Sequence, residues 1–219
     1  MHVEKASSAG LEPPVVSVAG LPRDKKVVAE AARVAAAALR DNPTHIAMHG
    51  EDPAKRYAGL YVLCQGVLSS ASSPPLHAVD QHGRVVGVLN AAPPGRCKPT
   101  LVQQVRMVPA MFRLNADTLR RMAYFGSAWS AYDPKTPHWH LGPVAVLPGS
   151  QGLGIGSMMM SVLCRRLDRD GAQAYLETDT EANVLFYRRF GFEIVGMSDV
   201  SNVHCWFMQR LPRREPDGS

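Results

Sequence analysis

Hydrophobic and polar positions along this chain follow two periods, that of short strands and that of amphipathic helices. Apolar runs bounded by turn residues predict strands at residues 15–18, 76–80, 85–89, 138–147, 173–178, 192–199 and 203–210. Apolar residues at helical spacing predict helices from Asp24 to a stop before Pro43, and at residues 53–68, 154–168 and 181–190. The order of elements is βααββ, an insert, and then βαβαββ, without an internal repeat.

The insert covers residues 100–132 and carries helical patterns that are broken at Pro109 and Asn115. Basic residues outnumber acidic ones between Arg96 and Arg121, and they account for nearly the whole net charge of +5. This charge indicates either a basic rim that attracts an anionic ligand or a solvated helix face. It comes without a recognition motif, so we expect no nucleic-acid partner.

Composition limits the class of protein further. The chain of 219 residues is long enough for one sizeable core, and we expect one domain over residues 14–211 with flexible ends at 1–13 and 212–219. No apolar run reaches the ~18 residues of a membrane span, and the first residues lack a signal-peptide pattern, which predicts a cytoplasmic protein. Four cysteines lack the spacing of a zinc site, and we expect buried or idle thiols, at Cys64, Cys97, Cys164 and Cys205.

The clearest candidate chemistry lies where the strand ending before Pro148 passes through a glycine-rich turn into the helix that starts near Ile155. Amide groups at such a turn and at a helix N-terminus bind phosphate oxygens, and glycine lets the main chain approach them closely. Gly152, Gly154 and Gly156 do not have the G-x-G-x-x-G spacing of a dinucleotide site, and no Lys-Ser/Thr pair of a Walker loop follows. The turn therefore predicts a site for another phosphorylated cofactor.

Two motifs identify that cofactor by resemblance. Gln151, Gly154 and Gly156 form Q-x-x-G-x-G, which resembles the acetyl-CoA pyrophosphate loop of the GNAT N-acetyltransferase superfamily. The segment 174–192, which ends in Tyr-Arg-Arg-Phe-Gly-Phe, together with Trp206-Phe-Met-Gln-Arg210, is similar to the puromycin N-acetyltransferase-like branch. The resemblance covers about residues 138–211. It implies an α/β (mixed α+β) domain with a mostly antiparallel sheet of about seven strands, splayed between strands 4 and 5 and flanked by helices.

The resemblance also implies acetyl-CoA as cosubstrate, no metal, and a set of contacts. The main chain at 144–146 would pair with the pantetheine arm, residues 151–157 would surround the pyrophosphate, and Phe186 with Arg188 or Arg189 would meet the adenine end unless this helix face is simply solvated. Asn183 would either bind the pantetheine amides or cap its helix. The expected cofactor-binding residues are Val144, Ala145, Val146, Gln151, Gly152, Leu153, Gly154, Ile155, Gly156, Ser157, Asn183, Phe186, Tyr187 and Arg189.

Direct acetyl transfer to an amine needs a neutral amine and a proton for the leaving thiolate. Tyr187 is the candidate acid, because a phenol can donate to a thiolate of similar basicity, and a core tyrosine is the alternative. Glu177, at the end of a strand, is a candidate base unless it pairs with an arginine. His140 is another candidate base; it shares one strand face with His138 by alternation, and both could instead be structural.

We therefore predict an acetyl-CoA-dependent N-acetyltransferase that acts on a primary amine of a small molecule, such as an aminonucleoside or a xenobiotic. The alternatives are an acetyltransferase for protein or peptide amines and a non-catalytic CoA-binding sensor domain. We expect no membrane partner, and a homodimer is left open. The insert residues that could cover an acceptor pocket or belong to the core are Met107, Met111, Phe112, Met122, Phe125 and Trp129.

Overall fold

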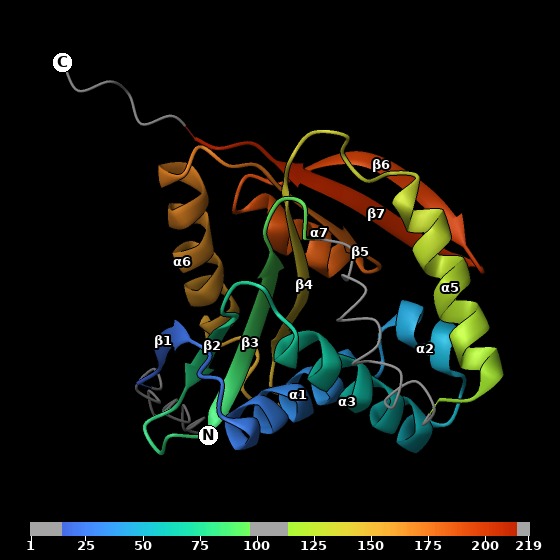
Figure 1. The fold of residues 1–219 in the computed structure, drawn as a ribbon, viewed down its shortest axis with the longest axis horizontal. Helices are drawn as coiled ribbons and strands as arrows, with labels where there is room; N and C mark the ends of the chain where they lie inside the picture. The colour runs from blue at the N-terminus through green and yellow to red at the C-terminus, as the bar shows by residue number, and fades with distance from the viewer. Residues whose placement is uncertain (1–14, 97–113, 214–219) are drawn as a thin grey trace, which may run out of the picture.

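A seven-stranded sheet organises the chain in the computed structural model, which describes residues 15–96 and 114–213. The strand order is β1-β2-β3-β4-β5-β7-β6 (Figure 1). The strands are β1 (Ser17–Gly20), β2 (Leu76–Val79), β3 (Val85–Ala92), β4 (Trp139–Val146), β5 (Ala174–Thr178), β6 (Glu193–Val200) and β7 (Val203–Arg210). The helices of the described residues are α1 (Lys25–Leu39), α2 (Pro43–His49), α3 (Pro53–Ser69), α5 (Ala116–Ser130), α6 (Ile155–Arg169) and α7 (Glu181–Arg188).

The sheet divides between β4 and β5. These two strands are parallel, and their register contains two Cα pairs, Trp139 with Ala174 and His140 with Tyr175. Beyond His140, β4 continues against β3 as far as Val146, while β5 continues against β7. The other pairs of neighbouring strands are antiparallel. The expected mixed sheet, splayed between its fourth and fifth strands, is confirmed.

Helices cover both faces of the sheet. On one face α1 packs against apolar side chains of β3 and β4, such as Val88 and Ala145, while on the other α6 packs against Leu89 and Leu141. A third cluster joins α2 and α5 to the β5–β7 half of the sheet through Phe125 and its neighbours. In Figure 1, α5 and α2 lie side by side near β6 and β7. The opening between β4 and β5 is therefore bordered by helices from both halves of the chain.

Local sequence explains where most helices begin. The Asp24 carboxylate accepts hydrogen bonds from the amides of Lys26 and Val27 at 2.7 and 3.2 Å, and Asp52 and Asn115 act in the same way at α3 and α5. The sequence pattern does not predict helix α2, because Pro43 marks only the end of the preceding helix in that pattern. Proline is equally suited to the first helical turn, and it starts α2 there.

Some expectations differ from the structure at the start of the described chain or lie outside the described residues. Strand β1 lies two residues later than the predicted 15–18. Residues 1–14, 97–113 and 214–219 lie outside the described residues, so the ends, most of the basic segment, Cys97, Met107, Met111 and Phe112 are not placed. None of the described helices has the length and apolarity to cross a membrane. Cys64, Cys164 and Cys205 are free and buried, as expected.

Candidate active site

Main-chain groups of β4 face the opening in the sheet. The amide of Leu147 donates to the carbonyl of Val86 at 2.9 Å, so the main-chain groups of Leu147 point toward β3. Main-chain direction alternates along a strand, and Ala145 therefore also points to β3 while Val144 and Val146 point toward β5. No strand fills that side, because the β4–β5 register stops at His140. These two residues can bind an extended ligand as a strand would.

The turn after β4 has the geometry that its glycines predict. Gly152 and Gly154 have φ of +79° and +80°, a region that favours glycine. Gly154 is the N-cap of α6 and supplies no side-chain cap, so the first amides of this helix stay available to an anion. The side-chain amide of Gln151 donates to the carbonyl of Val146 at 3.2 Å and ties the turn to the strand end. The turn can therefore hold a phosphate through main-chain amides.

Phe186 of α7 and Arg189, which follows this helix, lie beside this turn. A Cβ on Gly156 would lie 3.3 Å from the Phe186 ring, and the Arg189 guanidinium stands over the same ring, 5.0 Å from its centroid. The side chains of Ala145 and Ile155 are buried in the core, so only their main chain can reach a ligand. Leu153, in contrast, is half exposed on the turn.

A cavity of about 560 Å³ continues the opening toward the helices. It brings together four of the residues singled out in the sequence, His140, Glu177, Asn183 and Tyr187, with Val144 at its wall. Helices α3 and α5 contribute apolar side chains to its lining, including Leu60, Leu63, Val67 and Trp129. Of the insert residues expected at a pocket or in the core, Trp129 lines the cavity, whereas Phe125 is fully buried and Met122 packs beside it.

Glu177 and His140 form a pair inside this cavity. The His140 Nε2 atom lies 2.9 Å from Oε2 of Glu177, and the two side chains are 25% and 9% exposed. Among the described residues, the hydrogen-bond partner of the Glu177 carboxylate is this imidazole and not an arginine. The two candidate bases are thus one hydrogen-bonded unit, in which the carboxylate can orient the ring and stabilise its protonated form.

Tyr187 and Asn183 occupy one face of α7 and both line the cavity. Burial, and to a lesser extent the charge of Asp179, raise the pKa of the Tyr187 hydroxyl above its usual value, so the phenol stays neutral. Asn183 does not cap helix α7, so the alternative that it serves as the helix cap is wrong. The N-cap is Thr180, whose hydroxyl accepts from the Asn183 amide at 3.3 Å, and the Asn183 side chain is left to the cavity.

A family model described as the acetyltransferase (GNAT) family matches residues 53–192. The chain belongs to the GNAT acetyltransferase family. The match spans the splayed strands, the glycine turn and α7, which are the elements that the motifs at Gln151 and Tyr187 led us to expect. The protein is therefore an acyltransferase of the GNAT family, whose fold binds acetyl-CoA.

Solved structures share the GNAT fold at low sequence identity. One is histone acetyltransferase HPA2 and related acetyltransferase from Corynebacterium glutamicum, with 21% identity over 94% of this chain and 100% of that one and a TM-score of 0.67. Another is arylalkylamine N-acetyltransferase 2 from Aedes aegypti, with 8% identity, 90% and 99% coverage and a TM-score of 0.62. A Brucella melitensis GNAT acetyltransferase solved with acetyl-CoA has 19% identity, 94% coverage of both chains and a TM-score of 0.51. The puromycin N-acetyltransferase-like branch stays a prediction.

Several residues at the GNAT cavity, some of them with titratable side chains, were not among the predicted site residues. His45 of α2 and Asp133, which follows α5, line it, and Tyr175 of β5 lies fully buried under the rings of His138 and His140. Asp179 also lines the cavity, and its carboxylate accepts from the Thr44 amide at 2.8 Å, which fixes α2 against the site. Only Tyr175 carried a signal, because it is two residues before Glu177 and therefore shares its face of β5.

Proposed function

We propose that the protein is a cytoplasmic, acetyl-CoA-dependent N-acetyltransferase that moves an acetyl group directly to a primary amine of a small molecule. The observation that supports this most is the cavity at the opening of the sheet, which brings the expected groups together. It contains the Glu177–His140 pair and the neutral Tyr187 phenol together with the open edge of β4 at Val144. These are the groups that direct transfer from a thioester requires.

In this proposal the two ends of acetyl-CoA have separate sites. The amides at 152–157 hold the pyrophosphate, with Gln151 supporting the turn through Val146 and with Phe186 and Arg189 beside it. The main chain of Val144 and Val146 pairs with the pantetheine arm, Asn183 binds its amides, and one β4 amide polarises the thioester carbonyl. This arrangement leaves the acetyl group at the mouth of the cavity.

The chemical step uses the paired base first. The Glu177–His140 pair accepts the proton from the acceptor ammonium, and the amine nitrogen then forms a bond with the acetyl carbonyl carbon. The carbon–sulfur bond breaks, the electron pair goes to sulfur, and the positively charged nitrogen releases its remaining extra proton to solvent. Because burial raises the pKa of Tyr187, full transfer of its proton to a thiolate is unfavourable. Its hydroxyl instead donates a hydrogen bond to the thiolate sulfur and stabilises it until solvent protonates it.

The lining of the cavity favours a small acceptor with an apolar body and a cationic amine. Leu60, Leu63, Val67 and Trp129 form apolar walls, and the carboxylate of Glu177 lies at the reacting end. A small molecule can fill such a space, whereas a protein N-terminus or lysine needs a surface groove. An aminonucleoside or a xenobiotic amine, as the puromycin-like resemblance implies, fits these requirements.

The test is a screen of acetyl-CoA with small primary amines, short peptides and no acceptor, read by thiol release and by mass spectrometry of the products. We expect thiol release with one class of small amine and a product that carries one acetyl group on nitrogen. Faster acetylation of peptides would contradict the small-molecule assignment. Binding of acetyl-CoA with no release for any amine would instead favour a non-catalytic CoA-binding domain.

A further inference from the structure

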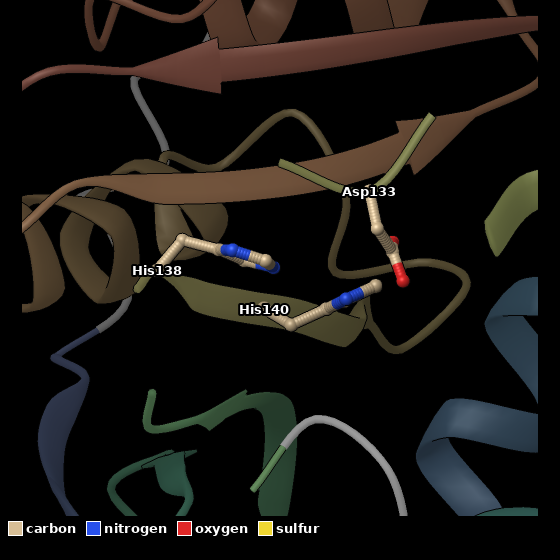
Figure 2. A group of neighbouring side chains, drawn as sticks. All are labelled: Asp133, His138 and His140. Atoms are coloured by element: carbon tan, nitrogen blue, oxygen red, sulfur yellow. The ribbon is translucent and has the colours of Figure 1, made fainter. Parts of the chain in front are cut away.

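Three potential metal ligands meet beside the cavity. Asp133, His138 and His140 each offer one ligand atom, and these atoms lie within 4.8 Å of one another. Figure 2 shows the ring of His140, on β4, and the ring of His138, on the residue just before this strand, both near the Asp133 carboxylate. Two imidazoles and one carboxylate are a ligand set for divalent transition metals such as Zn²⁺.

The hydrogen bonds of the two rings orient them as metal-binding histidines are oriented. Nδ1 of His138 lies 2.9 Å from the carbonyl of Thr136, which can only accept, so a neutral ring carries its proton there and its lone pair on Nε2. Nε2 of His140 lies 2.9 Å from the Glu177 carboxylate, which places the lone pair of a neutral ring on Nδ1. Such outer contacts to a carbonyl and a carboxylate fix the ring and raise its basicity as a ligand.

A second observation comes from Tyr175, which packs edge-on against both rings. Its side chain is 0% exposed, and its hydroxyl has no hydrogen-bond partner within the described part of the chain. A buried hydroxyl without a partner is costly, and a water bound to a metal would provide one.

We propose that Asp133, His138 and His140 bind one Zn²⁺-like divalent ion, with Glu177 and Thr136 supporting the two imidazoles. Zinc–ligand distances of about 2.0–2.2 Å place ligand atoms of a tetrahedral site about 3.3 Å apart. Since the three atoms lie within 4.8 Å of one another, they close by at most about 1.5 Å on binding. Asp133 and His140 line the cavity, which gives the ion a path of entry. A fourth position is left for water near Tyr175.

The ion would be a regulator rather than a participant in acetyl transfer. It would occupy a nitrogen of His140, whose ring belongs to the proposed base, and a metal-bound imidazole cannot accept the amine proton. Zn²⁺ bound here therefore inhibits the reaction, and a chelator restores it. This consequence rests on the proposed function, whereas the binding of the ion does not.

The test is a titration of the full chain with Co²⁺, followed by its visible d–d absorption, and with Zn²⁺ as competitor. We expect one equivalent of Co²⁺ with the spectrum of a four- or five-coordinate site, displaced by Zn²⁺. His138→Ala and Asp133→Asn should each weaken binding at least about tenfold. His204→Ala, at an exposed histidine paired with Asp199, is the matched control and should bind as the parent does.

Folding of each variant is checked by circular dichroism, and Asp133→Asn keeps the test valid if His138→Ala is unfolded. The proposal is overturned if the parent takes up no Co²⁺ at equimolar micromolar concentrations, or if both variants bind it as tightly as the parent. A site that binds Co²⁺ as expected while Zn²⁺ leaves acetyl transfer unchanged supports the metal site and contradicts the role of His140 as base.

Discussion

Replacing Glu177 by glutamine separates the two members of the proposed base. Glutamine has nearly the same shape, and its side-chain oxygen can still accept from Nε2 of His140, where the carboxylate now lies at 2.9 Å. The substitution therefore removes the charge and keeps the geometry. With the Glu177 side chain 9% exposed, solvent screens this charge only partly.

The size of the loss in kcat/KM distinguishes two roles for Glu177. If His140 accepts the proton and Glu177 only stabilises the imidazolium, the loss is the difference between a charged and a neutral hydrogen bond, about 1–2 kcal/mol, or about 5- to 30-fold in kcat/KM. If Glu177 itself is the base, the loss is that of a general base, about 10²- to 10⁴-fold. In either case the pH profile of kcat/KM should change, because one member of the pair no longer titrates.

The assay is steady-state thiol release at saturating acetyl-CoA over the neutral to alkaline range, for the parent, Glu177→Gln, His140→Gln and the double variant. Residues that act as one unit are non-additive, so the double variant should be little worse than the poorer single variant. Glu193→Gln, at an exposed glutamate of β6, is the control. The assignment of Glu177 and His140 as the base would be refuted if both single variants kept kcat/KM within about threefold of the parent and had unchanged pH profiles.

Three further predictions concern the Tyr187 hydroxyl, the glycine turn and the helix beside the site. Tyr187→Phe should lower turnover about tenfold or more, while the exposed Tyr124→Phe should not, and a loss under about threefold contradicts the role. Gly154→Glu should weaken CoA binding measured by calorimetry at least about 100-fold, whereas Gly171→Glu, which has a similar positive φ at the other end of α6, should not. Burial lowers the pKa of His45 to about 4. Below pH ~6.5 the unfolded chain therefore binds more protons, and lowering the pH from 8 to 5 should remove about 2 kcal/mol of stability in urea titrations. A His45→Gln variant with the same pH dependence would refute this.

Local signals predicted most of the fold. Asp24 and the glycines of the turn at 152–156 act through their own neighbours, so their positions could be read from the sequence. Pro43 could not be assigned in this way, since proline both ends one helix and starts the next. The sequence left open whether Asn183 caps its helix, and only the backbone geometry shows that Thr180 is the cap.

The composition of the site depended on tertiary structure. His140 and Glu177 are 37 residues apart, and they meet because the parallel register places His140 beside Tyr175. Packing of α2 and α5 on the sheet brings His45 and Asp133 to the cavity, and no local pattern marks either residue. The splay between β4 and β5 came from the family resemblance, because strand periodicity does not reveal where two strands separate.

The most direct test of the account is a crystal structure of the protein with CoA. We expect the pyrophosphate at the amides of 152–157, the pantetheine arm along Val144 and Val146 in the opening between β4 and β5, and the sulfur within hydrogen-bonding reach of the Tyr187 hydroxyl. CoA bound at another place, or in this opening with its sulfur turned away from both Tyr187 and the Glu177–His140 pair, would contradict it.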